Sequence, residues 1–529
     1  MKTKKYTVGV DFGTSTMVLA VGSVDETGMV DVETVVSDST RGIENGLIEN
    51  INAVSELLLK LKREAEAQLG IRIEEAYAGI SGAFIRYENY IDHVFVSEMS
   101  NGIVTVADVE ALHERMRHVT VPEGEVIMDC FPQNYSVDGR REEPDPVGVF
   151  GRQLSSKFAF IISEKKPLDR LQMVFKNTGM RLAGIFANSA VMSGAVLSPE
   201  EMSEGAVTVD IGGGCTDIAI CKGGLLRYAA SIPLGAKAID DDINKHGVPE
   251  HLAEKLKIQC GSAIAEFVPE QKCIQISRSN RMSKVVMKHN LASIIEARLT
   301  DIAEYVKGEI RDSGYDKKLP CGIVLTGGAA ATPDIDKLFS RITDMNVRTA
   351  TACEGLAEGS AQKIDSPDYT AAIALLLAGA KRGAFEAASS DDSAQDEQEP
   401  QREPQREPQR EPQREPQRVV PRQPAEEENG GHTNVEQADE ESDSADGESR
   451  EHGRGWKLKI PKINIFGKVG NRMGRGVELL STLIEGGEDN DPSFSDIDQE
   501  ASGHGGRRRK TDAHGSSDFL IEGEDKDEI

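Results

Sequence analysis

Apolar residues follow two alternating patterns along the first 384 residues of this 529-residue chain. Short runs rich in β-branched residues predict strands, and longer stretches with apolar residues at every third or fourth position predict helices. The predicted strands are 6–10, 17–23, 31–36, 76–80, 206–210, 216–221 and 322–326. The predicted helices are 50–69, 106–117, 166–178, 249–259, 290–312 and 367–382. Because strands that alternate with helices are typical of α/β proteins, we expect an α/β fold here.

Three of the predicted strands run directly into glycine-rich turns. Their sequences are VGVDFGTST at 8–16, VTVDIGGGCTD at 207–217 and IVLTGGAA at 323–330. Backbone N–H groups in a tight turn form an anion site, and glycine lets a phosphate approach closely. The predicted phosphate-binding residues are Gly13, Thr14, Ser15, Gly212, Gly213 and Gly214.

Two aspartates, Asp11 and Asp210, stand where a strand meets its turn. Carboxylates at such points can hold Mg²⁺ through its waters, because Mg²⁺ needs few protein ligands. Asp11 and Asp210 are therefore the predicted metal-binding and catalytic residues. In the third turn, Gly327 and Gly328 are expected to pack against an adenosine. None of the three turns ends in the Gly-Lys-Ser/Thr of a P-loop.

A steric explanation of these turns competes with the functional one. Strand–glycine turns occur in many α/β proteins because glycine fits tight chain reversals. A single turn would leave both explanations open. Three turns in this order favour one nucleotide held between two similar halves of the chain.

Several further segments carry a resemblance to known proteins. They are GISGAFIRYEN at 79–89, FPQNYSVDG at 131–139, GLLRYAASIPLGAKAIDDDI at 224–243 and AEKLKIQCG at 253–261. Over about residues 1–380 the chain resembles the actin/Hsp70/sugar-kinase superfamily of ATP-binding folds. Within it, the chain is similar to the FtsA family of bacterial cell-division proteins. The resemblance places Glu254 and Lys257 near the ribose and base of the nucleotide.

The resemblance implies an actin-like ATPase fold of two lobes that binds ATP with Mg²⁺. The first lobe is expected at 1–202 with an inserted subdomain at 81–162, and the second at 203–384 with an insertion at 234–316. It further implies filaments of the protein itself, with the first insertion contacting neighbouring subunits. The second insertion would meet the tail of FtsZ, the tubulin-like division protein. Such a protein anchors the FtsZ ring to the cytoplasmic face of the inner membrane at the division site and recruits other divisome proteins.

The composition changes after residue 384. The motif EPQR is repeated five times over 399–418, and a proline in every fourth position prevents a continuous helix. Low apolar content cannot support a core, so a disordered linker is predicted over 385–453. As a flexible coil, about 70 residues have an r.m.s. span of roughly 45 Å. A partner that binds polyproline remains an alternative role for this segment.

Residues 454–485 combine basic and apolar residues at helical spacing. The segment predicts a helix that lies in a membrane surface, attracted by anionic lipid and held by apolar burial. Docking into a protein groove is the alternative. The predicted apolar and aromatic membrane contacts are Trp456, Phe466, Val469, Met473, Val477, Leu480 and Ile484, and the basic contacts are Lys468, Arg472 and Arg475. The acidic tail at 486–529 is expected to be disordered, and its role stays open.

The formal net charge of −28 argues against general binding of nucleic acid, which depends on neutralising phosphates. Seven cysteines without a Cys-x-x-Cys pair indicate a reducing compartment.

A metabolic kinase or phosphatase of the same superfamily is the main alternative to a division adaptor. Such an enzyme needs a general base directed at the phosphate. Beyond Asp11 and Asp210 the sequence offers only Asn188 and Ser189 nearby, which are poor bases. We therefore expect at most a weak ATPase. An Hsp70-like chaperone is disfavoured because no substrate-binding β-domain follows the core.

Overall fold

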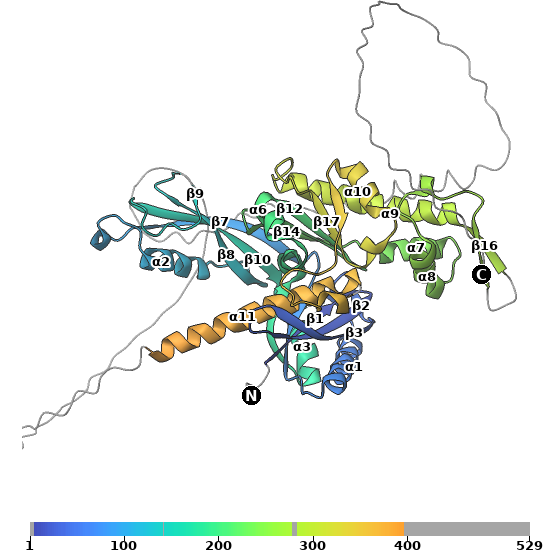
Figure 1. Cartoon of the computed structure of the whole chain (residues 1–529), viewed down its shortest axis with the longest axis horizontal. Coiled ribbons are helices and arrows are strands. Elements are labelled where there is room, and N and C mark those ends of the chain that lie inside the picture. Colours follow the sequence, from blue (N-terminus) through green and yellow to red (C-terminus); the bar gives the residue numbers. More distant parts are fainter. Residues whose placement is uncertain (1–4, 141, 278–282, 365, 396–529) are drawn as a thin grey trace, which may run out of the picture. The chain divides into compact units, whose positions relative to one another are not determined.

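The computed structural model describes residues 5–140, 142–277, 283–364 and 366–395 (Figure 1). All of them fall within one unit, Met1–Val420. The predicted membrane segment 454–485, the tail 486–529 and the linker beyond residue 395 lie outside the described residues. Among the described residues, no helix is both long and apolar enough to cross a membrane.

The first lobe is built on a five-stranded sheet with the order β11-β6-β1-β2-β3. Its strands are β1 (Tyr6–Phe12), β2 (Thr16–Val24), β3 (Val30–Ser39), β6 (Glu75–Ile80) and β11 (Arg181–Ala187). The helices α1 (Ile51–Leu69) and α3 (Lys165–Thr178) cover the face to which Val8, Val10 and Phe12 point. The short strands β4 (Ile43–Glu44) and β5 (Leu47–Ile48) pair beside it.

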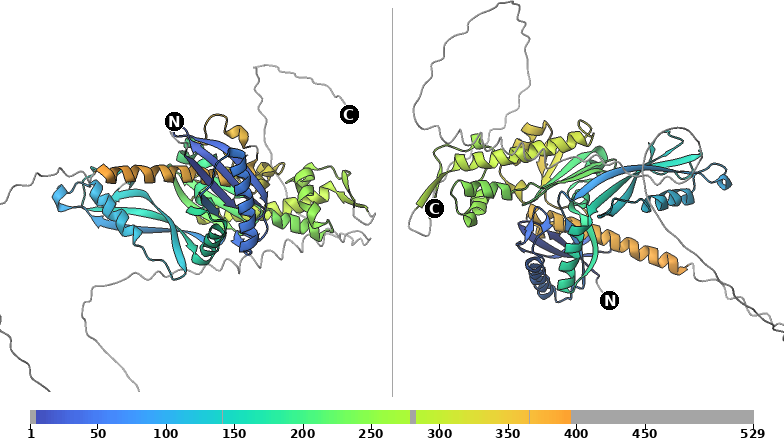
Figure 2. Two further views of the ribbon diagram at one scale, coloured as in Figure 1. Left: turned by 90° about the horizontal axis from the view of Figure 1, so that it is seen from below. Right: turned by 180° about the vertical axis from the view of Figure 1, so that it is seen from behind.

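The last helix, α11 (Thr370–Gln395), covers the other face of the first-lobe sheet (Figure 2). Gly9 permits this packing, because a Cβ there would lie 2.7 Å from the backbone nitrogen of Leu376. The helix continues beyond residue 382, where the sequence pattern predicted its end. No glycine or proline interrupts residues 384–395, so nothing in the chain stops the helix sooner.

The second lobe repeats this architecture with the order β14-β13-β12-β17-β18. Its strands are β12 (Ala206–Ile211), β13 (Thr216–Lys222), β14 (Leu225–Ile232), β17 (Ile323–Thr326) and β18 (Val347–Thr349). In both sheets three antiparallel strands are followed by two parallel ones. The helices α9 (Lys288–Asp312) and α10 (Ile335–Thr343) pack on the second sheet. The predicted α/β fold of two similar lobes is confirmed.

The lobes are joined by three short helices after β11. These are α4 (Asn188–Val191), α5 (Ser193–Val196) and α6 (Pro199–Glu204). Ser198 and Glu201 form a capping box at the start of α6, which explains why the chain becomes helical there.

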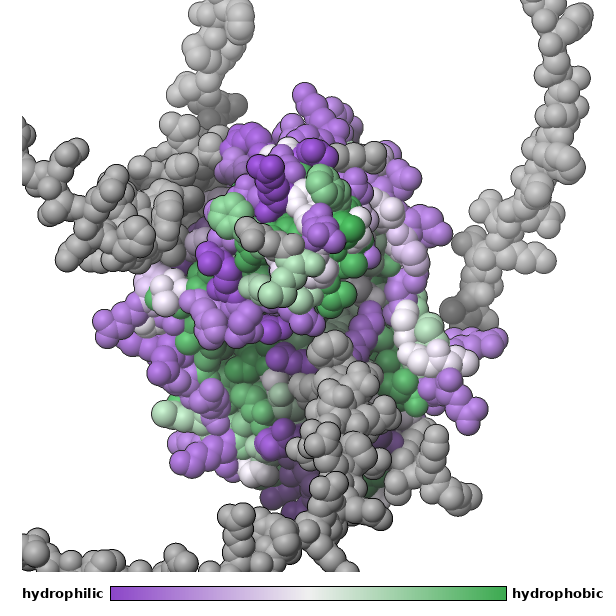
Figure 3. Space-filling view, turned by 90° about the vertical axis from the view of Figure 1, so that its left-hand side faces the viewer, coloured by the Kyte–Doolittle hydropathy of each residue, from purple (hydrophilic) through white to green (hydrophobic). Residues whose placement is uncertain are grey.

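The first insertion is a separate small sheet with the order β7-β10-β8-β9, and α2 (Val106–Arg117) covers one face. Its strands are β7 (Ile85–Phe95), β8 (Glu125–Val137), β9 (Glu142–Glu143) and β10 (Gln153–Glu164). Apolar side chains of Phe95, Met99 and Phe150 are exposed on this insertion. Figure 3 looks onto the side where the insertion lies in Figure 1 and shows apolar side chains exposed among polar ones.

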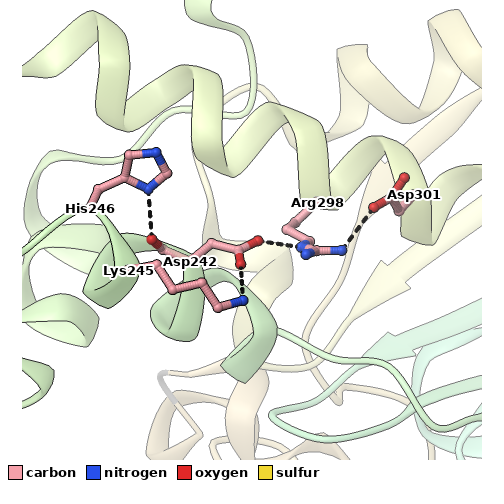
Figure 4. A network of polar contacts seen from close by, with 5 residues as sticks. All are labelled: Asp242, Lys245, His246, Arg298 and Asp301. Atoms are coloured by element: carbon pink, nitrogen blue, oxygen red, sulfur yellow. Dashed lines mark hydrogen bonds and ion pairs between the residues drawn. The ribbon is translucent and has the colours of Figure 1, made fainter. Parts of the chain in front are cut away.

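The second insertion contains α7 (Lys237–Lys245), α8 (Glu250–Cys260) and a hairpin of β15 (Cys273–Ser277) and β16 (Ser283–Met287). A polar network fastens α7 to α9 (Figure 4). Arg298 of α9 donates to Asp242 and, over 3.1 Å, to Asp301, while Lys245 lies 2.8 Å from Asp242. Burial alone would raise the pKa of Asp242, but the donors Arg298 and Lys245 hold it below its usual value. The network therefore pairs the charges of Arg298 and Asp242 in a largely buried position.

Candidate functional site

The first two glycine turns meet at one cavity between the two hairpins. Asp11 lies near the end of β1 and Asp210 near the end of β12, and both aspartates are buried. The cavity has a volume of about 50 Å³. The predicted site residues that line it are Asp11, Gly13, Thr14, Asp210, Gly212, Gly213 and Gly214.

The two turns are packed directly against each other. A Cβ at Gly213 would lie 2.1 Å from the Ser15 hydroxyl oxygen, and one at Gly214 would lie 2.4 Å from the Thr14 hydroxyl oxygen. Ser15 does not line the cavity itself, but its side chain holds the opposite turn in place. The glycines of the second turn are therefore required by the hydroxyl side chains of the first.

The second turn is supported from behind by the chain that follows β14. The backbone N–H groups of Ala236 and Lys237 donate to the carbonyl oxygens of Gly212 and Gly213 over 2.9 and 2.8 Å. Lys257 of α8 in turn holds this segment, with its ammonium 2.7 Å from Asp240 and 3.4 Å from the Ala236 carbonyl. Lys257 thus acts on the turn indirectly.

Glu254, which lies one turn before Lys257 on α8, is exposed. Neither Glu254 nor Lys257 lines the cavity.

The third glycine turn packs beneath the second aspartate. Gly327 has a φ of 84°, and a Cβ there would lie 2.1 Å from Oδ1 of Asp210. A Cβ at Gly328 would come equally close to Oδ1 of Asp368, the residue before Tyr369 and the start of α11. The third turn therefore lets Asp210 and Asp368 approach the chain, and it does not line the cavity.

Three buried carboxyl groups are crowded at the cavity. Desolvation raises the pKa of Asp11 to about 7, against the lowering effect of a hydrogen bond from Asn188. Desolvation likewise raises the pKa of Asp217 to about 6. The pKa of Asp210 is well above its usual value, because of burial and then the charges of Asp217, Asp11 and Asp368. A cation near these groups would favour their charged forms.

Asp217, Ser81 and Asn188 belong to this site but were not among its predicted residues. Asp217 stands opposite Asp210 in the β12–β13 register, so the symmetric hairpin around the glycines was a signal available in the sequence. Asn188, which was considered only as a poor base, donates to Asp11 over 2.8 Å and to Ser81 over 3.0 Å. Ser81 donates to Asp217. Residues so far apart in sequence have no local pattern that joins them.

The arrangement fits a polyphosphate with a divalent cation. The glycines of the second turn leave their backbone covered by the small hydroxyl side chains of Thr14 and Ser15, which a phosphate could replace. Oδ1 of Asp217 is buried without a hydrogen-bond partner in the part of the chain that the structure describes. No group of three or more His, Cys, Asp or Glu side chains among the described residues is arranged to bind a metal ion directly. Asp11 and Asp210 would hold a hydrated cation through its waters.

Two family models match parts of this chain. The model described as cell division protein FtsA matches residues 207–374, and the model of the SHS2 domain inserted in FtsA matches residues 86–162. The chain is 31% identical over 357 residues to the cell division protein FtsA of Bacillus subtilis, covering 66% of this chain and 80% of that protein. It is 28% identical over 380 residues to FtsA of Pseudomonas aeruginosa, covering 72% of this chain and 90% of that protein.

A solved structure shares this fold at low sequence identity, and a second one matches more weakly. A PilM–PilN type IV pilus biogenesis complex contains a chain that matches with a TM-score of 0.50 and 14% identity. The match covers 71% of this chain and 98% of that chain. Spiroplasma citri MreB5 bound to ADP matches with a TM-score of 0.42 and 15% identity, over 74% of this chain and 98% of that one.

Proposed function

Because this chain belongs to the FtsA family of cell-division proteins, we propose that it binds ATP and attaches FtsZ filaments to the cytoplasmic face of the inner membrane. The observation that carries the nucleotide part is the meeting of two strand–Asp–glycine turns from two similar lobes at one cavity. Backbone N–H groups of both turns would bind the phosphates from opposite sides. Mg²⁺ would neutralise phosphate charge when bound, with Asp11 and Asp210 holding its waters.

Nucleotide binding requires the two turns to separate. Pockets for small ligands have volumes of roughly 300–1,000 Å³, well above the volume of this cavity. The contacts of Ser15 with Gly213 and of Thr14 with Gly214 lie where the phosphates would enter. We infer that ATP replaces these contacts as the lobes open.

Hydrolysis of ATP at this site is expected to be slow. Asp11 and Asp210 would be bonded to the waters of the cation, so neither would be free to accept a proton from the attacking water. Among the described residues that line the cavity there is no histidine, lysine or glutamate, and the remaining carboxylate, Asp217, accepts a hydrogen bond from Ser81. The site supports binding and a conformational response better than rapid turnover.

The two insertions are the proposed contact surfaces for protein partners. On the second insertion Ile258 and Phe267 are exposed, and the Lys337 ammonium lies 5.3 Å from the centre of the Phe267 ring. An apolar side chain next to a cation suits the tail of FtsZ if that tail carries apolar and acidic residues. Phe95, Met99 and Phe150 of the first insertion would contact neighbouring copies of this chain in a filament.

Attachment to lipid is proposed for segment 454–485, whose basic and apolar residues suit an anionic membrane surface. A single interfacial helix attaches weakly, whereas a filament carries many helices, so avidity would make attachment firm. Recruitment of other divisome proteins would follow from this position. No specific feature of the cavity favours the alternative, a kinase or phosphatase for a small molecule.

Co-sedimentation of the full chain with anionic vesicles tests the attachment. We expect the full chain to pellet with vesicles and to carry FtsZ polymers with it, more strongly with Mg–ATP than without. A variant that lacks 454–485 should stay in the supernatant and still bind ATP. If that variant pellets as well as the full chain, the lipid assignment is wrong.

A further inference from the structure

The first insertion is joined to the first lobe, where Ile85 and Ile161 are part of the core, and it also contacts the second lobe. The chain leaves β6 at Ile80 and begins β7 at Ile85, so residues 81–84 form the start of the insertion. Within this short connection, Ser81 donates to Asp217 of the second lobe. The backbone N–H of Gly82 donates to the hydroxyl of Ser231 in β14 over 2.9 Å. Two consecutive residues therefore cross from one lobe to the other.

The contact continues along the insertion, where β7 lies beside β14. The rings of Tyr87 and Tyr228 have their centres 5.7 Å apart. Arg227 of β14 donates to the side-chain oxygen of Gln133 in β8 over 3.0 Å. The insertion thus has aromatic, backbone and charged contacts with one strand of the second lobe, which we call the β7–β14 seam.

Ser81 also connects this seam to the cavity. Its hydroxyl accepts a hydrogen bond from Asn188 over 3.0 Å, and Asn188 donates to Asp11 over 2.8 Å. A continuous chain of hydrogen bonds therefore runs from Asp11 through Asn188 and Ser81 to Asp217. Asn188 is held in this orientation because Gly79 leaves room for it, a Cβ there lying 2.1 Å from Oδ1 of Asn188.

We propose that Ser81 is a positioning residue that orients Asp217 in the cavity and transmits nucleotide binding to the first insertion along the β7–β14 seam. The proposal rests on the proposed nucleotide site. When ATP separates the two turns, Ser81 and Gly82 keep the start of the insertion attached to the second lobe. Because the insertion also packs on the core of the first lobe through Ile85 and Ile161, a movement of the second lobe would act on the insertion through the β7–β14 seam and change the position of its exposed surface. The surface proposed for contacts between subunits would thereby respond to nucleotide.

Hydrogen–deuterium exchange of the full chain tests this inference. Calorimetry first measures Mg–ATP binding by each protein, and exchange of peptides covering 85–95 and 225–232 is then compared with and without Mg–ATP. In the unaltered protein we expect the exchange rate of these peptides to change by roughly tenfold on binding, the size expected for one coupled hydrogen bond. In Ser81→Ala this nucleotide-dependent change should be lost at a concentration of Mg–ATP that calorimetry shows to saturate the variant.

Two variants and one control separate a positioning role from a structural one. Ser81→Thr keeps the hydroxyl and should keep the response. Ser231→Ala lies in the second lobe and removes the acceptor of the Gly82 N–H, so it should reduce the response. Ser156→Ala is the matched control, because Ser156 is a buried serine of the same insertion. Among the described residues, its hydroxyl bonds only to backbone oxygens within the insertion. It should leave the response intact.

The outcomes distinguish this inference from the proposed function. If the unaltered protein binds Mg–ATP and its seam peptides do not respond, the inference is wrong and the nucleotide site stands. A full response in both Ser81→Ala and Ser231→Ala would overturn it in the same way. If the unaltered protein takes up no ATP, the proposed nucleotide function fails and the inference fails with it.

Discussion

The two hairpins that form the cavity share a backbone and differ in their side chains. In the first lobe Asp11 stands opposite Val18, whereas in the second Asp210 stands opposite Asp217. The first turn carries two hydroxyl side chains, and the second carries three glycines that make room for them. The two hairpins are therefore complementary. The first supplies the hydroxyl side chains, and the second supplies the space that they fill and an additional carboxylate, Asp217.

The two insertions differ in a similar way. The second insertion is fixed within its own lobe by the largely buried network around Arg298 and Asp242. The first insertion is attached to the opposite lobe through the β7–β14 seam. An insertion that contacts both lobes can report their relative position, and an insertion that is fixed within one lobe cannot.

The largest expected effect comes from the ion pairs that hold the insertions. Arg298→Ala removes the buried partner of Asp242 and leaves the exposed Lys245 as its charged partner, so we expect a loss of about 3 kcal/mol in the free energy of unfolding of the second insertion. Arg115→Ala in the first insertion breaks an exposed pair with Asp92, and we expect a loss below about 1 kcal/mol. Urea denaturation, monitored by the hydrogen exchange of peptides from α7 and α2, measures both losses in free energy. Equal losses would contradict the distinction between the two insertions.

A smaller effect is expected from the packing of one turn against the other. Gly213→Ala places a Cβ against Ser15, and overpacking of this kind costs about 2 kcal/mol. Ser15→Gly removes the clashing atoms and should restore much of the stability in the double variant. A double-mutant cycle of unfolding free energies measures the coupling between the two turns. Simple additivity would show that the turns do not touch in solution.

The sequence allowed the glycine turns and the two aspartates of this site to be predicted, but not the hydrogen bonds that join them to residues elsewhere in the chain. Asp11 and Asp210 were predictable because each lies near the end of a buried strand and two residues before a glycine, a pattern contained in a few residues. Ser81 and Asn188 were not, since their role depends on pairing between segments that lie far apart in the chain. Lys257 was assigned to the nucleotide by resemblance, and this stays a prediction. The structure shows its ion pair with Asp240, in the segment that supports the second turn.

The fold, like the site, was predictable where the sequence signal is local. Strand–helix alternation predicted both lobes, because hydrophobic periodicity is a local property. The end of α11 was misplaced because the apolar pattern stops before the helix does, and nothing after residue 384 breaks it before Gln395. The β7–β14 seam depends on tertiary contacts of tyrosine and arginine side chains, which have no periodic signature.

The smallest expected effect is the pH dependence of the nucleotide-free protein. A carboxyl group whose pKa is raised by folding binds more protons in the folded state, so its contribution to stability falls as pH rises from about 4 to its folded value. For Asp11 and Asp217 this range ends at about 7 and about 6. Without nucleotide, Asp217→Asn should therefore raise the melting temperature at pH 8 by roughly 2–4 °C. The difference in melting temperature between the variant and the unaltered protein should disappear at pH 4. A lower melting temperature of the variant at pH 8 would contradict the interpretation that burial destabilises the charged form of Asp217.

The central claim is that the two glycine turns hold one adenine nucleotide between the lobes, and isothermal calorimetry with saturating Mg²⁺ tests it most directly. The account predicts uptake of one ATP for each chain and an affinity lower by about 10- to 100-fold in Asp210→Ala, which loses a charge-assisted contact. Circular dichroism would show that the variant remains folded. Absence of ATP uptake by the folded protein, or equal affinity in the Asp210→Ala variant, would contradict the account.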